Sequence, residues 1–336
     1  IWEGANTGDD AQINMSGNAS WKGNSEGKGA KITLGSKKRM RTFSLRSTGP
    51  VWEGDNSGED TELVIGTRAS WIGNNIGGNI KVEGDIDGLW QGDNAGTVTV
   101  DGITWNGDNL TNATAIVGSG VWDGNNFGTA TFNGGNWNGD NKEPGKVTVT
   151  ADGWTGNNAG SVTLNNGTWD GSNSGTVIMT NGAWDGVNSG TVTVNGGTWS
   201  GNNETKGNAT IAGGTWNGIN ASTATIEGGT WTNNNSGTVT FNGGGWSGDN
   251  TENGEVIVNA NGWTGDNAGE VTITGGTWIG ASSGSVILNQ GTWGGINTGS
   301  ATIKGGIWNG TNSGTVTLNQ GTWSGDNSNA ATIHGG

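Results

Sequence analysis

Large apolar side chains recur along this chain at a short, nearly fixed interval. Successive tryptophans lie 15 residues apart over most of the sequence, and nearly all of them are followed by Gly at the second position and Asn at the fourth. Of the nineteen gaps between successive tryptophans, eleven span 15 residues, four span 17, three span 19 and one spans 31. A short fixed period indicates one supersecondary unit that must stack on its own neighbours to bury its apolar face.

Each repeat contains two runs with two-residue alternation, separated by Gly and Asn clusters that favour turns. Around Trp199 these runs are 191–194, Thr-Val-Thr-Val, and 198–203, Thr-Trp-Ser-Gly-Asn-Asn. A unit of fifteen residues is too short for a helical hairpin. The pattern therefore predicts an all-β, single-domain parallel β-solenoid of about 20 coils, mostly of 15 residues, with one tryptophan in each coil.

Strand alternation places the tryptophan, the residue two later and the residue four later on one face. The second of these is Gly in nineteen copies and the third is Asn in eighteen, whereas the residues between them vary freely. We therefore expect Trp, Gly and Asn to point inward, with the glycine leaving space for the indole and with apolar pairs such as Val192 and Val194 completing the layer. The predicted core positions include Trp169, Trp184, Trp199 and Trp216, with Asn173, Asn188, Asn203 and Asn220.

Buried asparagines need hydrogen-bond partners, and identical amides stacked one coil apart can satisfy one another as a ladder. Ser25 and Ser282 replace the asparagine in two copies, so we expect weak layers there. The inward asparagines include Asn56, Asn94, Asn126, Asn173, Asn188 and Asn312. With these residues the chain resembles right-handed parallel β-helix proteins, and it looks like the passenger regions of secreted bacterial adhesins and surface fibres. The resemblance concerns architecture and implies an extracellular or cell-surface location.

Coil length divides the chain into two continuous parts. Residues 1–89 contain the 19-residue and 31-residue gaps, so we expect larger, irregular coils there, with a basic insertion at 35–46. Residues 90–336 are expected to form regular coils of 15 or 17 residues. Three of the 17-residue repeats add two residues directly after Asn141, Asn203 and Asn250, which marks a turn that faces solvent.

The net charge of −15 argues against nucleic acid or an anionic membrane surface as a partner. The sequence has no run of ~18 apolar residues, so we expect no membrane span. A single His, with no Cys and no Tyr, leaves few nucleophile and base pairs. We therefore predict that the chain is not an enzyme and binds no cofactor or metal. Because Ile1 is not an initiator Met, we expect a mature form or a slice of a longer chain.

Threonines at alternate positions of the second run are expected to face outward as paired rows of hydroxyl groups. This arrangement is similar to the binding face of insect ice-binding solenoids, although threonine also suits exposed strands intrinsically. Lys146, Ile178 and Glu255 interrupt the rows. The candidate surface-binding residues are Thr97, Thr99, Thr191, Thr193, Thr238, Thr240, Thr315 and Thr317, and the candidate partner is a host surface, a solid surface or a carbohydrate.

The two ends of the chain continue the repeat into each other. Joining the last residue to the first gives Gly-Gly-Ile-Trp-x-Gly, which also occurs at 305–310, and the junction spans one 15-residue period. The leading prediction is therefore a structural extracellular β-solenoid that binds copies of itself head to tail in a surface filament. The predicted junction consists of Trp2, Asn6, Trp323 and Asn327. The alternatives are an adhesin shaft or ice- and surface-binding module that uses the threonine face, and thirdly a carbohydrate-active enzyme on a β-helix.

Overall fold

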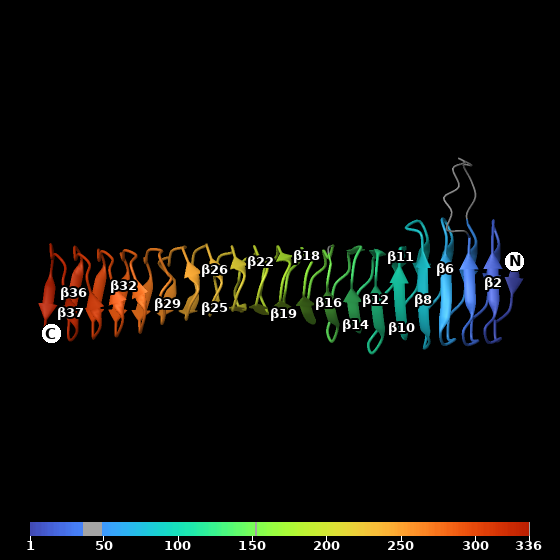
Figure 1. The fold of residues 1–336 in the computed structure, drawn as a ribbon, viewed down its shortest axis with the longest axis horizontal. Coiled ribbons are helices and arrows are strands. Elements are labelled where there is room, and N and C mark those ends of the chain that lie inside the picture. The colour runs from blue at the N-terminus through green and yellow to red at the C-terminus, as the bar shows by residue number, and fades with distance from the viewer. Residues whose placement is uncertain (36–48, 152, 336) are drawn as a thin grey trace, which may run out of the picture. The chain divides into compact units, whose positions relative to one another are not determined.

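The computed structural model describes residues 1–35, 49–151 and 153–335. Apart from Gly35, the basic insertion at 35–46 lies outside the described residues. The described parts of the chain consist of β-strands joined by turns and bends, arranged as a parallel β-solenoid (Figure 1). The predicted fold class is therefore confirmed. Among these residues there is no helix that could cross a membrane.

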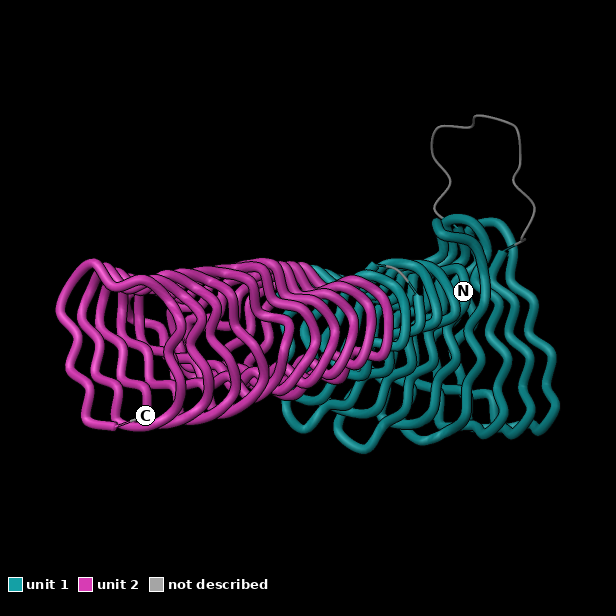
Figure 2. The backbone as a smooth tube through the Cα atoms, turned by 60° about the vertical axis from the view of Figure 1, so that its left-hand side comes forward, with its two compact units in different colours: residues 1–171 teal, residues 172–336 magenta. Residues whose placement is uncertain are grey.

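The chain forms two compact units, residues 1–171 and residues 172–336 (Figure 2). Each unit contains ten tryptophans and is built from the same two alternating series of strands. One series carries the tryptophans, and the other carries the alternating Thr and Val positions.

In the first unit, the tryptophan-bearing series begins at the N-terminus and recurs once in most coils. Its strands are β1 (Trp2–Glu3), β3 (Ser20–Lys22), β5 (Val51–Glu53), β7 (Ser70–Ile72), β9 (Leu89–Gln91), β11 (Ile103–Asn106), β13 (Gly120–Trp122), β15 (Asn136–Trp137) and β18 (Thr168–Trp169). The apolar series lies between them in the chain. Its strands are β2 (Gln12–Met15), β4 (Lys31–Leu34), β6 (Thr61–Ile65), β8 (Asn79–Gly84), β10 (Thr97–Asp101), β12 (Thr114–Val117), β14 (Thr129–Phe132), β16 (Lys146–Val149) and β17 (Ser161–Leu164).

The second unit repeats this order with shorter tryptophan-bearing strands. These are β20 (Ala183–Trp184), β22 (Thr198–Trp199), β24 (Thr215–Trp216), β26 (Thr230–Trp231), β28 (Gly245–Trp246), β31 (Thr277–Trp278), β33 (Thr292–Trp293), β35 (Ile307–Trp308) and β37 (Thr322–Trp323). The apolar series consists of β19 (Thr176–Met179), β21 (Thr191–Val194), β23 (Asn208–Ile211), β25 (Thr223–Ile226), β27 (Thr238–Phe241), β29 (Glu255–Val258), β30 (Glu270–Ile273), β32 (Ser285–Leu288), β34 (Ser300–Ile303), β36 (Thr315–Leu318) and β38 (Ala331–Ile333).

Within each unit, strands pair in parallel with the equivalent strand of the next coil, and the pairing stays in register with the repeat. In β22 and β24, Trp199 is opposite Trp216, and in β21 and β23, Val192 is opposite Ala209. The asparagines form a third column of isolated parallel bridges, such as that from Asn188 to the next coil. Side chains of one kind therefore stack on their own kind, because the period places them at the same point of every coil.

The side-chain directions follow the predicted alternation. Trp199, Val192 and Val194 are fully buried, whereas Thr191, which precedes Val192 in β21, is exposed. The predicted extent of the tryptophan-bearing strand is wrong, because β22 ends at Trp199 and Asn203 lies in a separate bridge. The chain bends at the intervening glycine, and the Asn column therefore forms a third side of the coil.

Candidate functional sites: the stacked columns and the outward face

The tryptophans of each unit form a column of stacked indole rings. Trp199 and Trp216 have ring centroids 4.8 Å apart and planes inclined by 3°. Spacings range from 4.5 to 4.9 Å in the first unit and from 4.4 to 5.4 Å in the second. The predicted core residues Trp169, Trp184, Trp199 and Trp216 are each at most 1% exposed. Stacking at these distances adds to the stabilisation that each buried aromatic ring contributes through its area.

Indole N–H groups of the inner coils donate hydrogen bonds to the backbone of the preceding coil. The Nε1–H of Trp199 donates a hydrogen bond of 2.9 Å to the carbonyl of Gly186, and that of Trp216 donates one of 3.0 Å to Gly201. A Cβ atom at Gly201 would lie 1.7 Å from the Gly186 carbonyl oxygen. The glycine two residues after each tryptophan therefore allows backbones of adjacent coils to approach closely, which sequence reasoning had explained only as space for the indole.

One coil departs from this glycine rule without losing the indole hydrogen bond. Asn233 occupies the position, and its side-chain amide donates to the Asn217 carbonyl at 3.0 Å. The Asn233 carbonyl still accepts the Nε1–H of Trp246 at 2.9 Å. The backbone carbonyl at this position is therefore the recurring functional group, and the side chain is secondary.

The asparagines form the predicted ladder. Asn188 donates from Nδ2 to Oδ1 of Asn203 at 2.8 Å, and Asn203 donates in the same way to Asn220 at 2.8 Å. Asn173 donates to Asn188 at 2.7 Å, and all four predicted residues are fully buried. The other hydrogen on Nδ2 is donated to a backbone carbonyl of the turn, as from Asn188 to Gly190 at 3.0 Å. Each amide thus ties two coils together and closes its own turn.

The two serine layers are where the ladder fails. Asn267 donates to Ser282 Oγ at 3.0 Å, and Asn6 donates to Ser25 Oγ at 3.3 Å. In the coils that follow, the Oδ1 atoms of Asn297 and Asn56 are buried and have no hydrogen-bond donor within the described structure. An unsatisfied buried acceptor costs free energy, so the prediction that Ser25 and Ser282 give weak layers agrees with the contacts.

The outward threonines lie where the sequence predicts them, in two rows on the apolar series of strands. The first row is exposed and contains Thr97, Thr191, Thr238 and Thr315, whereas the second row is half-buried and contains Thr99, Thr193, Thr240 and Thr317. In the earlier strands the residues in register with Thr99 are not β-branched, and they are Lys81, Glu62, Lys31 and Gln12. From β10 onward the second row is β-branched in every strand, because isoleucine replaces threonine where the hydroxyl is lost. Its members are Thr99, Ile116, Thr131, Thr148 and Thr163 in the first unit, and Ile178, Thr193, Thr210, Thr225, Thr240, Ile257, Thr272, Ile287, Thr302, Thr317 and Thr332 in the second.

A further column runs along the turn three residues after the tryptophan in successive coils that carry Asp or Asn there, and sequence reasoning missed it. Oδ1 of Asn234 accepts the backbone N–H of Asp249 at 3.0 Å, and Oδ1 of Asp249 accepts that of Asp266 at 2.9 Å. The row ends at Ala281, whose N–H is bound by Asp266 at 2.8 Å. Asp and Asn replace one another within this row because both present the same Oδ1 acceptor. Their interchange along the sequence was the available signal.

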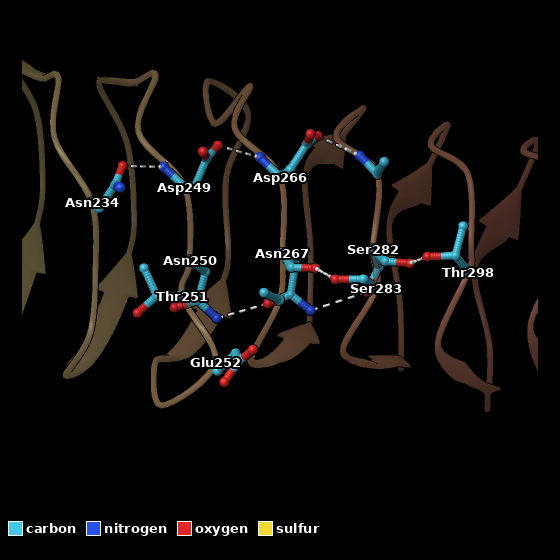
Figure 3. A pocket seen from close by; sticks show the side chains of 12 residues that line it. Asn234, Asp249, Asn250, Thr251, Glu252, Asp266, Asn267, Ser282, Ser283 and Thr298 are labelled. Carbon is cyan, nitrogen blue, oxygen red and sulfur yellow. Dashed lines mark hydrogen bonds between the residues drawn. The ribbon is translucent and has the colours of Figure 1, made fainter.

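A shallow groove of about 350 Å³ follows this column in the second unit (Figure 3). It is lined by Asp249, Glu252 and Asp266, with small side chains at Ala268 and Ala281. The dashed lines in Figure 3 show that both aspartates are already bound to backbone N–H groups of the next coil. The groove is therefore a hollow left by small side chains along a row of structural hydrogen bonds.

Ion pairs join neighbouring coils in the first unit. Lys31 Nζ lies 2.7 Å from Glu62 Oε2. This hydrogen bond and the attraction between the charges raise the pKa of Lys31 and lower the pKa of Glu62. Burial tends to raise the pKa of Asp140, but hydrogen bonds from Lys142 and from the backbone of Asn157 outweigh it and hold the pKa below its ordinary value. Exposed pairs such as Lys31 and Glu62 contribute little to stability.

The four residues of the predicted junction lie in terminal coils and are less buried than their inner counterparts. Trp2 is 45% exposed and stacks on Trp21 at 4.9 Å, whereas Asn6 is buried. Trp323 is half-buried, and the exposed Asn327 accepts a hydrogen bond of 2.8 Å from Asn312. The head-to-tail pairing of these residues between copies stays a prediction.

Among the described residues no group of three or more His, Cys, Asp and Glu side chains is arranged to hold a metal ion. The chain was also compared with known proteins. No protein-family model, curated protein or solved structure matches it. The assignment of the chain to a β-solenoid therefore rests on its own periodicity and contacts.

Proposed function

We propose that the chain is a structural segment of an extracellular or cell-surface fibre in which β-solenoid coils stack head to tail. The observation that carries the proposal is the uniformity of the contacts between coils. Within each unit the same Trp, Asn and apolar columns join one coil to the next, with like side chains in register. The two stacking faces of a coil are thus complementary, so a coil of one copy fits a coil of another.

The proposed partners are copies of the same chain. Trp2 is 45% exposed and Ile333 is 64% exposed, although the equivalent inner residues Trp21 and Ile303 are fully buried. An open strand edge of this kind templates pairing with another strand. A contact between two different faces does not close on itself, so it produces filaments. In such a contact Trp2 stacks on Trp323 of the neighbouring copy.

Electron microscopy and sedimentation velocity over a range of protein concentrations test this proposal. We expect the unaltered chain to form filaments and Trp2→Glu to stay monomeric, because a charge in the stacking layer cannot be desolvated. Glu3→Gln is the matched control, since this exposed residue of β1 points away from the layer, and it should still polymerise. An unaltered chain that remains monomeric at every concentration would overturn the proposal.

A second candidate function is binding of a solid surface by the outward threonine face. The observation that favours it is the β-branched character of the second row in every apolar strand from β10 onward, which includes Thr193 and Thr240. The double variant Thr193→Lys and Thr240→Lys should abolish retention on ice or on an insoluble polysaccharide if this face binds. Exposed Thr155, on the tryptophan-bearing side of a coil, provides a control position for the same substitution.

A further inference from the structure

The indole columns have a geometry that goes beyond packing. In the first unit the column runs from Trp2 to Trp169, and no centroid spacing between successive rings exceeds 4.9 Å. The ring planes are inclined by 3° to 15°. Successive rings are therefore stacked with nearly parallel planes through the whole unit. Electronic overlap between neighbours is the direct consequence of such an arrangement.

The composition of the chain leaves tryptophan as its most easily oxidised side chain. Tyrosine and cysteine, which would otherwise compete for an oxidising equivalent, are both absent, and there are only three methionines. A positive charge placed on one indole of the column therefore has other indoles as its nearest chemically equivalent sites. Equivalent sites have similar energies, so transfer between them needs little driving force.

The surroundings of the rings also favour retention of the charge. The Nε1–H of Trp90 donates to the Gly73 carbonyl at 2.9 Å, and that of Trp105 donates to the Gly92 carbonyl at 2.9 Å. A peptide carbonyl stabilises the N–H dipole but is too weak a base to remove the proton. The inner rings are also buried from water. An oxidised indole in the column therefore keeps its proton and remains a radical cation that its neighbour can reduce.

We propose that the indole column of each unit carries an electron hole from coil to coil. In the first unit, an outer-sphere one-electron oxidant removes one electron from the exposed ring of Trp2, which becomes a radical cation while the oxidant is reduced. Trp21 then transfers an electron to Trp2, so the positive charge moves one coil inward. Each further hop repeats this exchange without proton transfer. The hole leaves when a reductant supplies an electron to the oxidised ring. It also leaves when a ring that water can reach loses its N–H proton to that water and the neutral radical combines with a hydroperoxyl radical to form a hydroperoxide.

The experiment uses the absence of cysteine in the chain. A ruthenium polypyridyl complex is attached to Glu3→Cys, next to Trp2, and a flash with a soluble electron acceptor generates the ruthenium(III) oxidant in place. Transient absorption follows the tryptophan radical cation, and mass spectrometry locates the oxidised rings after trapping with oxygen. We expect oxidation to spread through inner tryptophans on both sides of Trp71.

Interrupting the column provides the decisive comparison. Trp71→Phe keeps an aromatic ring in the stack but replaces an oxidisable site, so oxidation beyond this coil should be lost while that of Trp2 and Trp21 remains. Phe132→Leu is the control, because Phe132 is buried outside the column, 6.4 Å from Trp137 and tilted by 38°. Trp105→Phe moves the interruption two coils onward and keeps the test valid if the first variant does not fold. Oxidation confined to Trp2 in every protein, or a spread unchanged by both interruptions, would overturn the proposal.

Discussion

Replacing Ser282 with asparagine should repair the weak layer of the second unit. The side chain of Ser282 accepts a hydrogen bond from Asn267 but reaches no further, and Asn297 Oδ1 in the next coil is left without a donor. In the intact ladder, Asn250 donates to Asn267 at 2.7 Å. An asparagine at 282 would present its Nδ2 to Asn297 in the same way. The variant Ser282→Asn therefore restores one hydrogen bond and satisfies one buried acceptor.

The magnitude follows from two opposing contributions. A buried acceptor without a donor costs about 1–3 kcal/mol, and satisfying it recovers most of that cost. Inserting a larger side chain into a packed layer costs about 1 kcal/mol when the layer has to adjust. The expected net gain is about 1 kcal/mol in the free energy of local unfolding around this layer.

The assay should report on local stability, because long repeat arrays do not unfold in one cooperative step. Hydrogen exchange of the Thr298 amide, which donates to the Ser282 carbonyl at 2.7 Å, should slow about fivefold for a gain of 1 kcal/mol. The reverse variant Asn235→Ser should expose the same defect in an intact part of the ladder and lose about 1–3 kcal/mol. Ser300→Asn, an identical change on the exposed face of β34, should have no effect beyond about 0.5 kcal/mol. The reasoning is refuted if Ser282→Asn and Ser300→Asn behave alike and Asn235→Ser is neutral.

Three further outcomes are expected. Trp199→Ala should lower the free energy of unfolding by about 3–5 kcal/mol because it leaves a large cavity, whereas Ser200→Ala should lower it by under about 0.5 kcal/mol. Chemical denaturation, monitored by intrinsic fluorescence, distinguishes the two. Gly201→Ala should cost about 1–3 kcal/mol by forcing adjacent backbones apart, whereas Gly294→Ala, whose Cβ would come no nearer than 3.6 Å to another atom, should be nearly neutral in the same assay. The first unit should lose stability in acid as the pH falls through the depressed pKa of Asp140. The reason is that a carboxyl group whose pKa is lowered in the folded state contributes its full stabilisation above its unfolded pKa and loses it as the pH falls through the folded pKa. Asp140→Asn should flatten this part of the pH profile in thermal melts, and an unchanged profile would contradict the assignment.

The sequence alone is sufficient to predict the columns, because their signal is contained within one repeat. Alternation around Trp199 separates the inward Trp and Asn from the variable residues between them, and the structure confirms that separation. Sequence also locates the two defective layers, since Ser25 and Ser282 stand out against the repeated asparagine. Because the period is regular, each residue can be compared with the residues at the equivalent position of other coils.

The features that the sequence does not reveal are contacts between neighbouring coils. The role of the Gly201 position as a close backbone contact appears only when the Gly186 carbonyl is placed against it. The row of side-chain oxygens that includes Asp249 and Asp266 was missed for the same reason, because its hydrogen bonds cross from one coil to the next. The sequence analysis predicted rows of hydroxyl groups and therefore counted Ile178 as an interruption. Ile178 nevertheless preserves the β-branched shape of its row.

The identity of the contacts from coil to coil also has a genetic consequence. Repeats that encode the same Trp, Gly and Asn positions provide similar stretches of DNA between which recombination can duplicate or delete one repeat in frame. The coil gained meets both of its neighbours through the same indole stack and amide ladder that joined them before, as between Trp199 and Trp216. Stability per coil therefore stays nearly constant while the number of coils changes. Length becomes a trait that can vary between lineages in whole-coil steps without any new packing having to evolve.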